Sequence, residues 1–180
     1  MFSIFSGLKN FICSRPTYYI LVIGRYHCGK STFLKTVVAL LNNTSHDYKV
    51  FPTSGLNIET IKYGRHVFTF WDLGGDADLI DLWKQYLNCC VLIYCIASDF
   101  NSFETRSSLE ELDNLLLEKD LQSVPLLLII TKCDIIIKPE TTITYKREDR
   151  PFKIIKTSSI TKNGINSCIQ WIANHIDHKL

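Results

Sequence analysis

Long apolar runs are missing from this sequence of 180 residues. A membrane-spanning helix needs about 18 or more consecutive apolar residues, and no run approaches that length. The N-terminus has neither a basic leader nor a long apolar core, so we expect no secretory signal. A large excess of charge of one sign is missing too. The sequence has 20 Lys and Arg and 18 Asp and Glu, for a formal net charge of +2. So small an excess gives no support for nucleic-acid binding.

Cysteines are present, but they lack the paired spacing of metal ligands. Their number is seven, which is odd, and three of them fall within the apolar run from Cys89 to Cys95. Reduced thiols buried in a cytosolic protein explain this pattern better than disulfides or a zinc site. Internal repeats and low-complexity tracts are also missing, and 180 residues are enough for one domain with a real hydrophobic core.

Strand-like and helix-like segments alternate along the chain, which predicts an α/β fold with a mostly parallel, six-stranded sheet covered by helices on both faces. Gly64 and Arg65 separate two strands and predict an antiparallel hairpin. The predicted strands span Tyr18–Ile23, Asn57–Tyr63, His66–Trp71, Cys90–Ala97, Pro125–Thr131 and Phe152–Lys156. The predicted helices span Lys30–Leu41, Ala77–Leu87, Phe103–Leu121 and Asn163–His178, the third with Leu109, Leu112, Leu116 and Leu117 on one face. The type of residues 135–150 stays open.

The first strand and helix enclose a phosphate-binding loop. Residues 24–31 read G-x-x-x-x-G-K-[ST], with Gly24, Gly29, Lys30 and Ser31 at the fixed positions. Backbone N–H groups of the loop and the helix N-terminus would face a polyphosphate. Lys30 would bring charge to the β- and γ-phosphates, and the Ser31 hydroxyl would bind Mg²⁺. The alternative is a glycine turn without a ligand. The remaining predicted nucleotide contacts in this stretch are Tyr26, His27, Cys28 and Thr32.

Polar residues follow three further predicted strands, at the end where open α/β sheets bind ligands. Asp72 and Gly75 form a D-x-x-G element, in which the carboxylate can hold a Mg²⁺-bound water and Gly75 can offer its N–H to a γ-phosphate. Alone this tetrapeptide is more often a turn. Thr53, which precedes the hairpin, has a hydroxyl that can complete the Mg²⁺ coordination and a backbone that can sense the γ-phosphate.

The sequence Thr131-Lys132-Cys133-Asp134 indicates a preference for guanine. The Asp134 carboxylate can accept hydrogen bonds from the guanine N1–H and amine, a pair that adenine cannot offer, and Lys132 can lie along the base. The alternative is an exposed polar loop at a strand end. In Thr157-Ser158-Ser159 the Ser159 amide can reach the guanine O6, although a helix N-cap is the competing interpretation for these residues.

With these motifs in place, the sequence resembles a small GTPase of the Arf family along nearly its whole length. Pro52-Thr53-x-Gly55-x-Asn57 is similar to the first switch of that family, and Phe70-Trp71-Asp72-Leu73-Gly74-Gly75 with Trp83 and Tyr86 is similar to its second. Gly55-Leu56-Asn57-Ile58 and Met1-Phe2 most resemble the Arf-related protein branch, which acts at the Golgi.

The resemblance implies a P-loop NTPase, namely a Ras-like G domain in residues 15–180 that binds GTP or GDP with Mg²⁺. The implied function is a molecular switch in membrane and vesicle trafficking. Effectors, an exchange factor and a GTPase-activating protein would bind the switch regions. The protein would be a cytoplasmic monomer that associates reversibly with Golgi or other endomembranes and binds no nucleic acid.

The first 14 residues fit this family too, because Phe2, Phe5, Leu8 and Phe11 recur at helical spacing. They predict an amphipathic helix that lies either in a membrane interface or against the core. Phe2 removes the N-myristoylation signal and is compatible with N-terminal acetylation. We expect Cys13 to be unmodified. By the family resemblance, GTP would make the hairpin slide by two residues and expel this helix, a slip that keeps side chains on their faces.

Two departures from the family pattern concern hydrolysis. Asp76 stands where Arf proteins carry the glutamine that orients the attacking water, and a carboxylate cannot donate a hydrogen bond to the transition state. Tyr26 brings bulk near the γ-phosphate. We therefore expect slow GTP hydrolysis, with Asp76 as a degenerate water-positioning site. Two other departures are Thr131, where most Arf proteins have asparagine, and the short segment 135–150.

The sequence thus supports two functions from different classes. One is a cycling GTPase switch, favoured by Lys30, Ser31, Thr53 and Asp72; the other is a GTP-bound scaffold that does not hydrolyse, favoured by Asp76 and Tyr26. A P-loop small-molecule kinase is more distant, because it would need an acceptor site and an arginine-rich lid that the sequence does not provide.

Overall fold

The computed structural model describes residues 15–45, 52–135 and 143–176. Within them, six strands form one sheet in the order β2-β3-β1-β4-β5-β6. Only the β2–β3 pair is antiparallel, and the other four pairs are parallel. The strands are β1 Thr17–Ile23, β2 Leu56–Tyr63, β3 His66–Leu73, β4 Val91–Ala97, β5 Leu126–Thr131 and β6 Phe152–Lys156. This arrangement confirms the predicted mostly parallel, six-stranded sheet.

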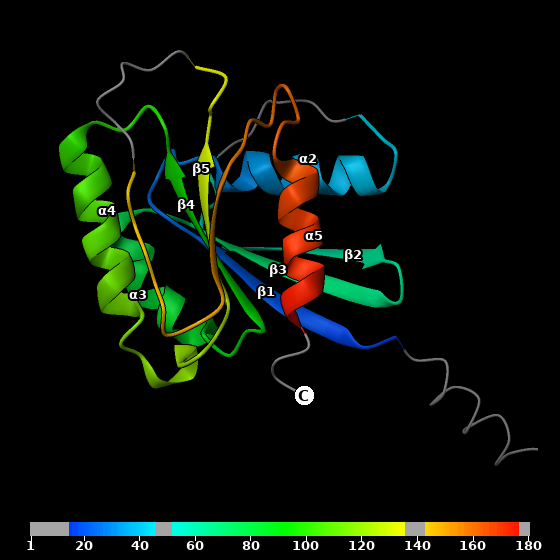
Figure 1. Ribbon diagram of the computed structural model, residues 1–180, viewed down its shortest axis with the longest axis horizontal. Helices are drawn as coiled ribbons and strands as arrows, with labels where there is room; N and C mark the ends of the chain where they lie inside the picture. The colour runs from blue at the N-terminus through cyan, green and yellow to red at the C-terminus, as the bar shows by residue number, and fades with distance from the viewer. Residues whose placement is uncertain (1–14, 46–51, 136–142, 177–180) are drawn as a thin grey trace, which may run out of the picture.

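Helices cover both faces of this sheet, with α2 and α5 on one side and α3 and α4 on the other (Figure 1). The α-helices are α2 Lys30–Leu41, α3 Ile80–Trp83, α4 Ser102–Leu115 and α5 Ile165–His175. The central strands are buried on both faces, so their residues alternate between two cores. In β1, for example, Ile20 and Val22 belong to the core under α2 and α5, whereas Leu21 and Ile23 belong to the core under α3 and α4.

The hairpin of β2 and β3 forms the edge of the sheet, as the Gly64-Arg65 pair predicted. Tyr63 pairs with His66, which leaves a two-residue turn, and Gly64 takes φ +56° there. Along the hairpin, Ile58 pairs with Trp71 and Asn57 pairs with Asp72. The same β3 strand pairs with β1 on its other side, where Val22 faces Asp72. The parallel pairing of β3 with β1 therefore sets the carboxyl ends of these two strands side by side.

The prediction of one continuous helix over Ala77–Leu87 is wrong. This stretch consists of a 3₁₀ turn at Ala77–Leu79, the one-turn α3, and a second 3₁₀ turn at Lys84–Tyr86. Only Trp83 and Leu87 are buried in it. Because short helices depend on tertiary packing, so little buried surface does not sustain a continuous helix.

The third predicted helix, Phe103–Leu121, is shorter than expected. The helix α4 begins at Ser102 behind an Asn101–Glu104 capping box and ends at Leu115, and a separate 3₁₀ turn covers Lys119–Leu121. Leu112 and Leu116 are buried as predicted, but Leu117 is 79% exposed, which corrects its place on the apolar face. The Leu117 N–H bonds the Asn114 carbonyl, three residues back, so the last turn tightens and carries Leu117 outward.

The segment whose type was left open, residues 135–150, is irregular over its described residues, 135 and 143–150. Its side chains attach it to α4 and to the 3₁₀ turn Lys119–Leu121. The Tyr145 hydroxyl donates to Asp113 at 2.6 Å, and the Arg150 guanidinium donates to the Leu121 carbonyl at 2.8 Å. The closing helix α5 begins at Ile165, two residues later than predicted, after Gly164.

The predicted N-terminal helix of residues 1–14 lies outside the described residues. Among the residues that are described, no helix combines the length and the apolar character needed to cross a membrane.

Replacing Gly164 by alanine tests how tightly α5 joins β6. A Cβ at Gly164 would overlap the Lys156 carbonyl, and its φ of +73° is disfavoured for alanine. We expect Gly164→Ala to lower the free energy of unfolding by about 3 kcal/mol or more. Gly64→Ala is the matched control, since its φ is also positive but nothing lies within 4 Å, and it should cost about 1 kcal/mol. Equal losses in urea unfolding would contradict this account.

Candidate functional site

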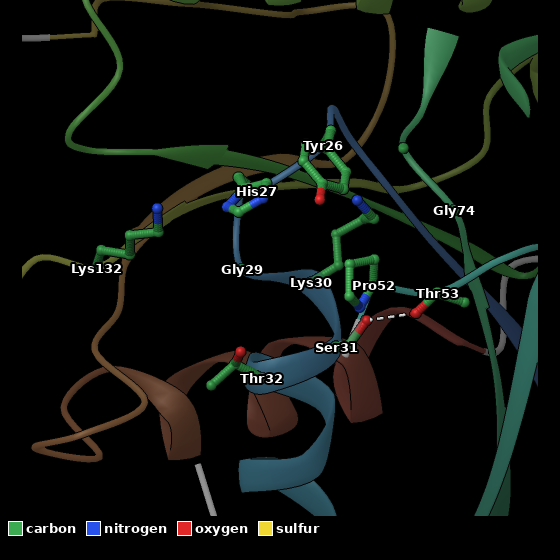
Figure 2. A pocket seen from close by; sticks show the side chains of 11 residues that line it. Tyr26, His27, Gly29, Lys30, Ser31, Thr32, Pro52, Thr53, Gly74 and Lys132 are labelled. Carbon is green, nitrogen blue, oxygen red and sulfur yellow. Dashed lines mark hydrogen bonds between the residues drawn. The ribbon is translucent and has the colours of Figure 1, made fainter. Parts of the chain in front are cut away.

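A cavity of about 270 Å³ opens at the carboxyl ends of the parallel strands, over the N-terminus of α2 (Figure 2). This is the edge at which open α/β sheets bind ligands. Its lining joins the phosphate loop, the segment before β2, the loop after β3 and the end of β5. The lining residues are Tyr26, His27, Gly29, Lys30, Ser31, Thr32, Pro52, Thr53, Gly74, Gly75 and Lys132.

The phosphate loop runs from the end of β1 to the start of α2, as predicted. Gly24 has φ +142°, and a Cβ there would overlap the Cys95 carbonyl, so the backbone approach requires glycine. Gly29 has φ +84° and stands at the N-cap of α2 without a side-chain cap. The first N–H groups of α2 are therefore free of a capping side chain. Such a helix start, with its partial positive charge, suits an anion.

Lys30 is buried, and its ammonium lies over the loop. It donates to the Gly24 carbonyl at 2.8 Å and to the Arg25 carbonyl at 3.0 Å. The Cys28 Sγ lies 3.7 Å from the same Nζ. Burial opposes ionisation of the Cys28 thiol, but the Cys95 thiol and the Lys30 ammonium outweigh it and lower its pKa to about 7. A buried cation thus faces the cavity at the point where a polyphosphate would need one.

Three oxygen-bearing side chains meet beside Lys30. The Ser31 Oγ and Thr53 Oγ1 are 2.9 Å apart, and Asp72 lies fully buried next to them. Neither carboxylate oxygen of Asp72 has a hydrogen-bond partner in the described part of the chain. Burial raises the pKa of the Asp72 carboxyl above its ordinary 3.8, while the nearby Ser31 hydroxyl and Lys30 ammonium oppose the rise.

This donor set fits a hard divalent cation. Two hydroxyls and an unpartnered buried carboxylate offer only oxygen, which is what Mg²⁺ prefers, and Mg²⁺ commonly keeps several waters. The described residues contain no group of three or more His, Cys, Asp or Glu that could hold a metal. An ion here would therefore take its remaining ligands from water and from phosphate oxygens.

The loop after β3 packs directly on the phosphate loop. A Cβ at Gly75 would overlap the Gly24 carbonyl and lie 2.6 Å from the Lys30 Nζ, and the Tyr26 N–H donates to the Gly75 carbonyl at 2.9 Å. The buried Trp83 indole donates to the Gly74 carbonyl at 2.9 Å, and the Gly74 N–H donates to the Gly55 carbonyl. The loop is thus fixed from both sides.

Of the residues predicted to bind the base, only Lys132, at the end of β5, lines the cavity. Thr131 is buried, and its hydroxyl donates to the Cys28 carbonyl at 2.5 Å, so it ties this end to the phosphate loop. Lys132 lines the cavity with φ +58° and pairs with Asp99 at 3.0 Å. Asp134 is exposed and Ser159 half-buried. Ser158 is buried, and its hydroxyl accepts the Thr161 N–H; because α5 begins only at Ile165 behind Gly164, this is a turn contact and not the N-cap of that helix.

Not every predicted site residue reaches the cavity. Gly24, Cys28, Asp72 and Thr131 lie behind its wall, whereas Asp76, Asp134, Ser158 and Ser159 are outside the lining. Sequence reasoning named Pro52 and Gly74 only as parts of the switch motifs, and it missed Asp99, which pairs with Lys132. Asp99 lies two residues beyond the end of β4, and this place near a strand end is the signal that would have identified it.

The chain as a whole is similar to known proteins. The family model of the ADP-ribosylation factor family matches residues 3–176. The chain belongs to this family. ADP-ribosylation factor-related protein 1 of Rattus norvegicus is 30% identical over 184 residues, an alignment that covers 96% of this chain and 91% of the relative. ADP-ribosylation factor-like protein 3 of Saccharomyces cerevisiae is 26% identical, with 96% and 92% covered.

A solved structure supports the fold of this Arf-family chain. The Arl6 (BBS3) small GTPase of Trypanosoma brucei, with a bound nucleotide analogue GppNp, superposes with a TM-score of 0.72 at 21% identity. The match covers 91% of this chain and 99% of that one. The predicted fold class, a Ras-like small GTPase fold, is therefore confirmed.

Asp72 offers a test of the oxygen cluster. Because its pKa is raised above 3.8, ionisation destabilises the empty fold: the stability present below pH 3.8 is lost as the pH rises through the raised value. At pH 7 in EDTA, Asp72→Asn should raise the unfolding free energy of the nucleotide-free protein by at least about 1 kcal/mol. It should also abolish the stabilisation by Mg²⁺ with GTP.

The exposed Asp78 provides the control, and Asp78→Asn should shift stability by less than about 0.5 kcal/mol with the Mg²⁺ response intact. Thermal unfolding with and without Mg²⁺ measures both effects. A destabilised Asp72→Asn protein that still responds to Mg²⁺ would contradict the assignment.

Proposed function

We propose that this chain is a guanine-nucleotide switch that binds GTP and GDP with Mg²⁺ and hydrolyses GTP slowly. The observation that carries the proposal is the convergence of Lys30 with the Ser31–Thr53–Asp72 oxygen cluster at the mouth of the phosphate loop. A cation for phosphate and an oxygen set for Mg²⁺ are the two parts that phosphoryl-transfer sites share. Membership of the ADP-ribosylation factor family supports the choice of a GTP-binding switch.

Each part of the cavity has a proposed role in this switch. Ser31 and Thr53 bind Mg²⁺ directly, and Asp72 binds it through water. The phosphates lie on the loop and the start of α2, and Gly75 faces the γ-phosphate. Asp134 and Lys132 bind guanine, while Thr131, Ser158 and Ser159 shape its pocket. The proposed phosphate contacts are Gly24, Tyr26, His27, Cys28, Gly29, Lys30, Ser31 and Thr32.

An exposed apolar surface beside the switch suits protein partners. Tyr19 stacks on Trp71 with ring centroids 4.8 Å apart, and Tyr86 meets Trp71 edge-on at 5.6 Å. Ile58, which pairs with Trp71 across the hairpin, is 53% exposed. Exposed aromatic side chains are common at protein interfaces. We propose that effectors, an exchange factor and a GTPase-activating protein bind here.

The cellular part of the proposal rests on the sequence and on the relatives. An amphipathic helix in residues 1–14, joined to a G domain in residues 15–180, would bring a cytoplasmic switch reversibly to a membrane. Similarity to Arf-related protein 1 and to an Arf-like protein supports a role in membrane trafficking, with the Golgi or another endomembrane as the location.

The nucleotide that co-purifies with the protein tests this proposal. Chromatography of the nucleotide released from purified protein should give GDP for a cycling switch. Bound GTP without an exchange factor would instead favour the second candidate function, a GTP-bound scaffold. Asp76 and Tyr26 are the residues that favour this scaffold function. Bound ATP would overturn both functions.

The rate of GTP hydrolysis distinguishes a cycling switch from a GTP-bound scaffold. Asp76 is exposed at the start of the 3₁₀ turn Ala77–Leu79, and its side chain can only accept hydrogen bonds when ionised. Single-turnover hydrolysis of [γ-³²P]GTP should be slow, and Asp76→Gln should accelerate it by about tenfold, which corresponds to about 1.4 kcal/mol in the barrier. Asp78→Gln, two residues further on and exposed, should leave the rate unchanged. A wild-type rate equal to that of ordinary Arf-like proteins with their activating proteins would contradict the proposal of slow hydrolysis.

A further inference from the structure

Two rings stand in the middle of the phosphate loop, where the motif leaves the residue type free. Tyr26 and His27 both line the cavity, and their ring centroids are 3.9 Å apart in an edge-on arrangement. His27 takes φ +60°, a left-handed backbone that is uncommon outside glycine. This backbone turn sets the imidazole beside the phenol ring.

Tyr26 gains little from burial in this place. Its side chain is 44% exposed and belongs to neither core cluster. Its backbone is nevertheless fixed, because the Tyr26 N–H donates to the Gly75 carbonyl at 2.9 Å. The residue therefore has a fixed position at the cavity mouth, and packing of its ring in the core does not account for it.

The Tyr26 hydroxyl points into the cavity. Figure 2 shows the Tyr26 hydroxyl and the Lys30 ammonium turned toward one another above Ser31 and Thr53. Lys30 can only donate hydrogen bonds, whereas a phenol can donate or accept. Two donors that converge on one volume, beside an oxygen cluster suited to Mg²⁺, would meet the same anionic oxygens.

We propose that Tyr26 is a ligand of the terminal phosphate of GTP, and that His27 positions its ring. This inference rests on the proposed function and names the residue that sets the preference for triphosphate over diphosphate. The phenol donates a hydrogen bond to a γ-phosphate oxygen, and GDP has no such oxygen. Hydrogen bonds to charged acceptors are about twice as strong as neutral ones, so the contact favours GTP selectively.

The same contact explains why Tyr26 joins the two loops. Its N–H holds Gly75 while its hydroxyl holds the terminal phosphate, so one residue links the phosphate to the loop after β3. A ligand that binds one conformation better shifts the population toward it. GTP bound through Tyr26 would therefore stabilise the arrangement in which Gly75 packs on the phosphate loop.

Tyr26→Phe removes the hydroxyl and keeps the ring. Dissociation constants for GTPγS and GDP, measured by fluorescence titration at fixed Mg²⁺, should show triphosphate affinity lowered by about tenfold. Affinity for GDP should change by less than about twofold. His27→Ala should lower the preference for GTPγS over GDP by a smaller factor than Tyr26→Phe does. The Tyr26 hydroxyl remains in this variant, but the Tyr26 ring loses the imidazole beside it.

Tyr63→Phe is the matched control. Tyr63 ends β2, lies outside the cavity and stacks on Phe68 with ring centroids 5.6 Å apart, so losing its hydroxyl should leave both affinities unchanged. Thermal unfolding of the nucleotide-free variants checks that all three fold as the wild type does.

Each other outcome contradicts the inference. Equal losses for GTPγS and GDP would mean that Tyr26 only supports the loop, and a rise in GTPγS affinity would mean that the hydroxyl obstructs the terminal phosphate. Wild-type protein that binds guanine nucleotides, together with an unchanged Tyr26→Phe ratio, would overturn this inference alone. Wild-type protein that binds no guanine nucleotide would overturn the proposed function as well.

Discussion

The contact of Gly75 with the phosphate loop is the constraint on which the site depends. With no side chain at this position, the loop after β3 can lie against the Gly24 carbonyl and the Lys30 ammonium. The backbone bond from Tyr26 to Gly75 then holds the two loops together. Any larger residue would push them apart, since the Cβ itself has no room. The cavity therefore has its present width because the two loops touch at a glycine.

A second tie joins the two ends of the cavity. The Thr131 hydroxyl reaches from the end of β5 to the Cys28 carbonyl, so the part that would bind a base is bonded to the part that would bind phosphate. The family resemblance implied asparagine at this position, and this chain has Thr131 instead. A threonine hydroxyl is short, but the close approach of Gly29, whose Cβ would lie 3.2 Å from the Thr131 Oγ1, brings the loop within its reach.

The strands and the phosphate loop could be predicted because their signals are local. Continuous apolar runs predicted strands buried on both faces, and the spacing from Gly24 to Ser31 predicted the loop geometry. The stretch after Asp76 could not be predicted, because its shape depends on how little of it the sheet buries. The exposure of Leu117 likewise follows from a tightened last turn, which periodicity does not reveal. The oxygen cluster was predicted as three separate residues, but its key property, an unpartnered buried Asp72, exists only in three dimensions.

The burial of Trp83 beside the loop after β3 also matters for the fluorescence of the protein. The protein has three tryptophans, and this one is fully buried with its indole N–H on the Gly74 carbonyl, one residue from Gly75. Indole emission depends on hydrogen bonding and on the polarity around the ring. A movement of the loop after β3 would therefore alter the light that Trp83 emits. The chain carries its own optical reporter of that loop, with no dye attached.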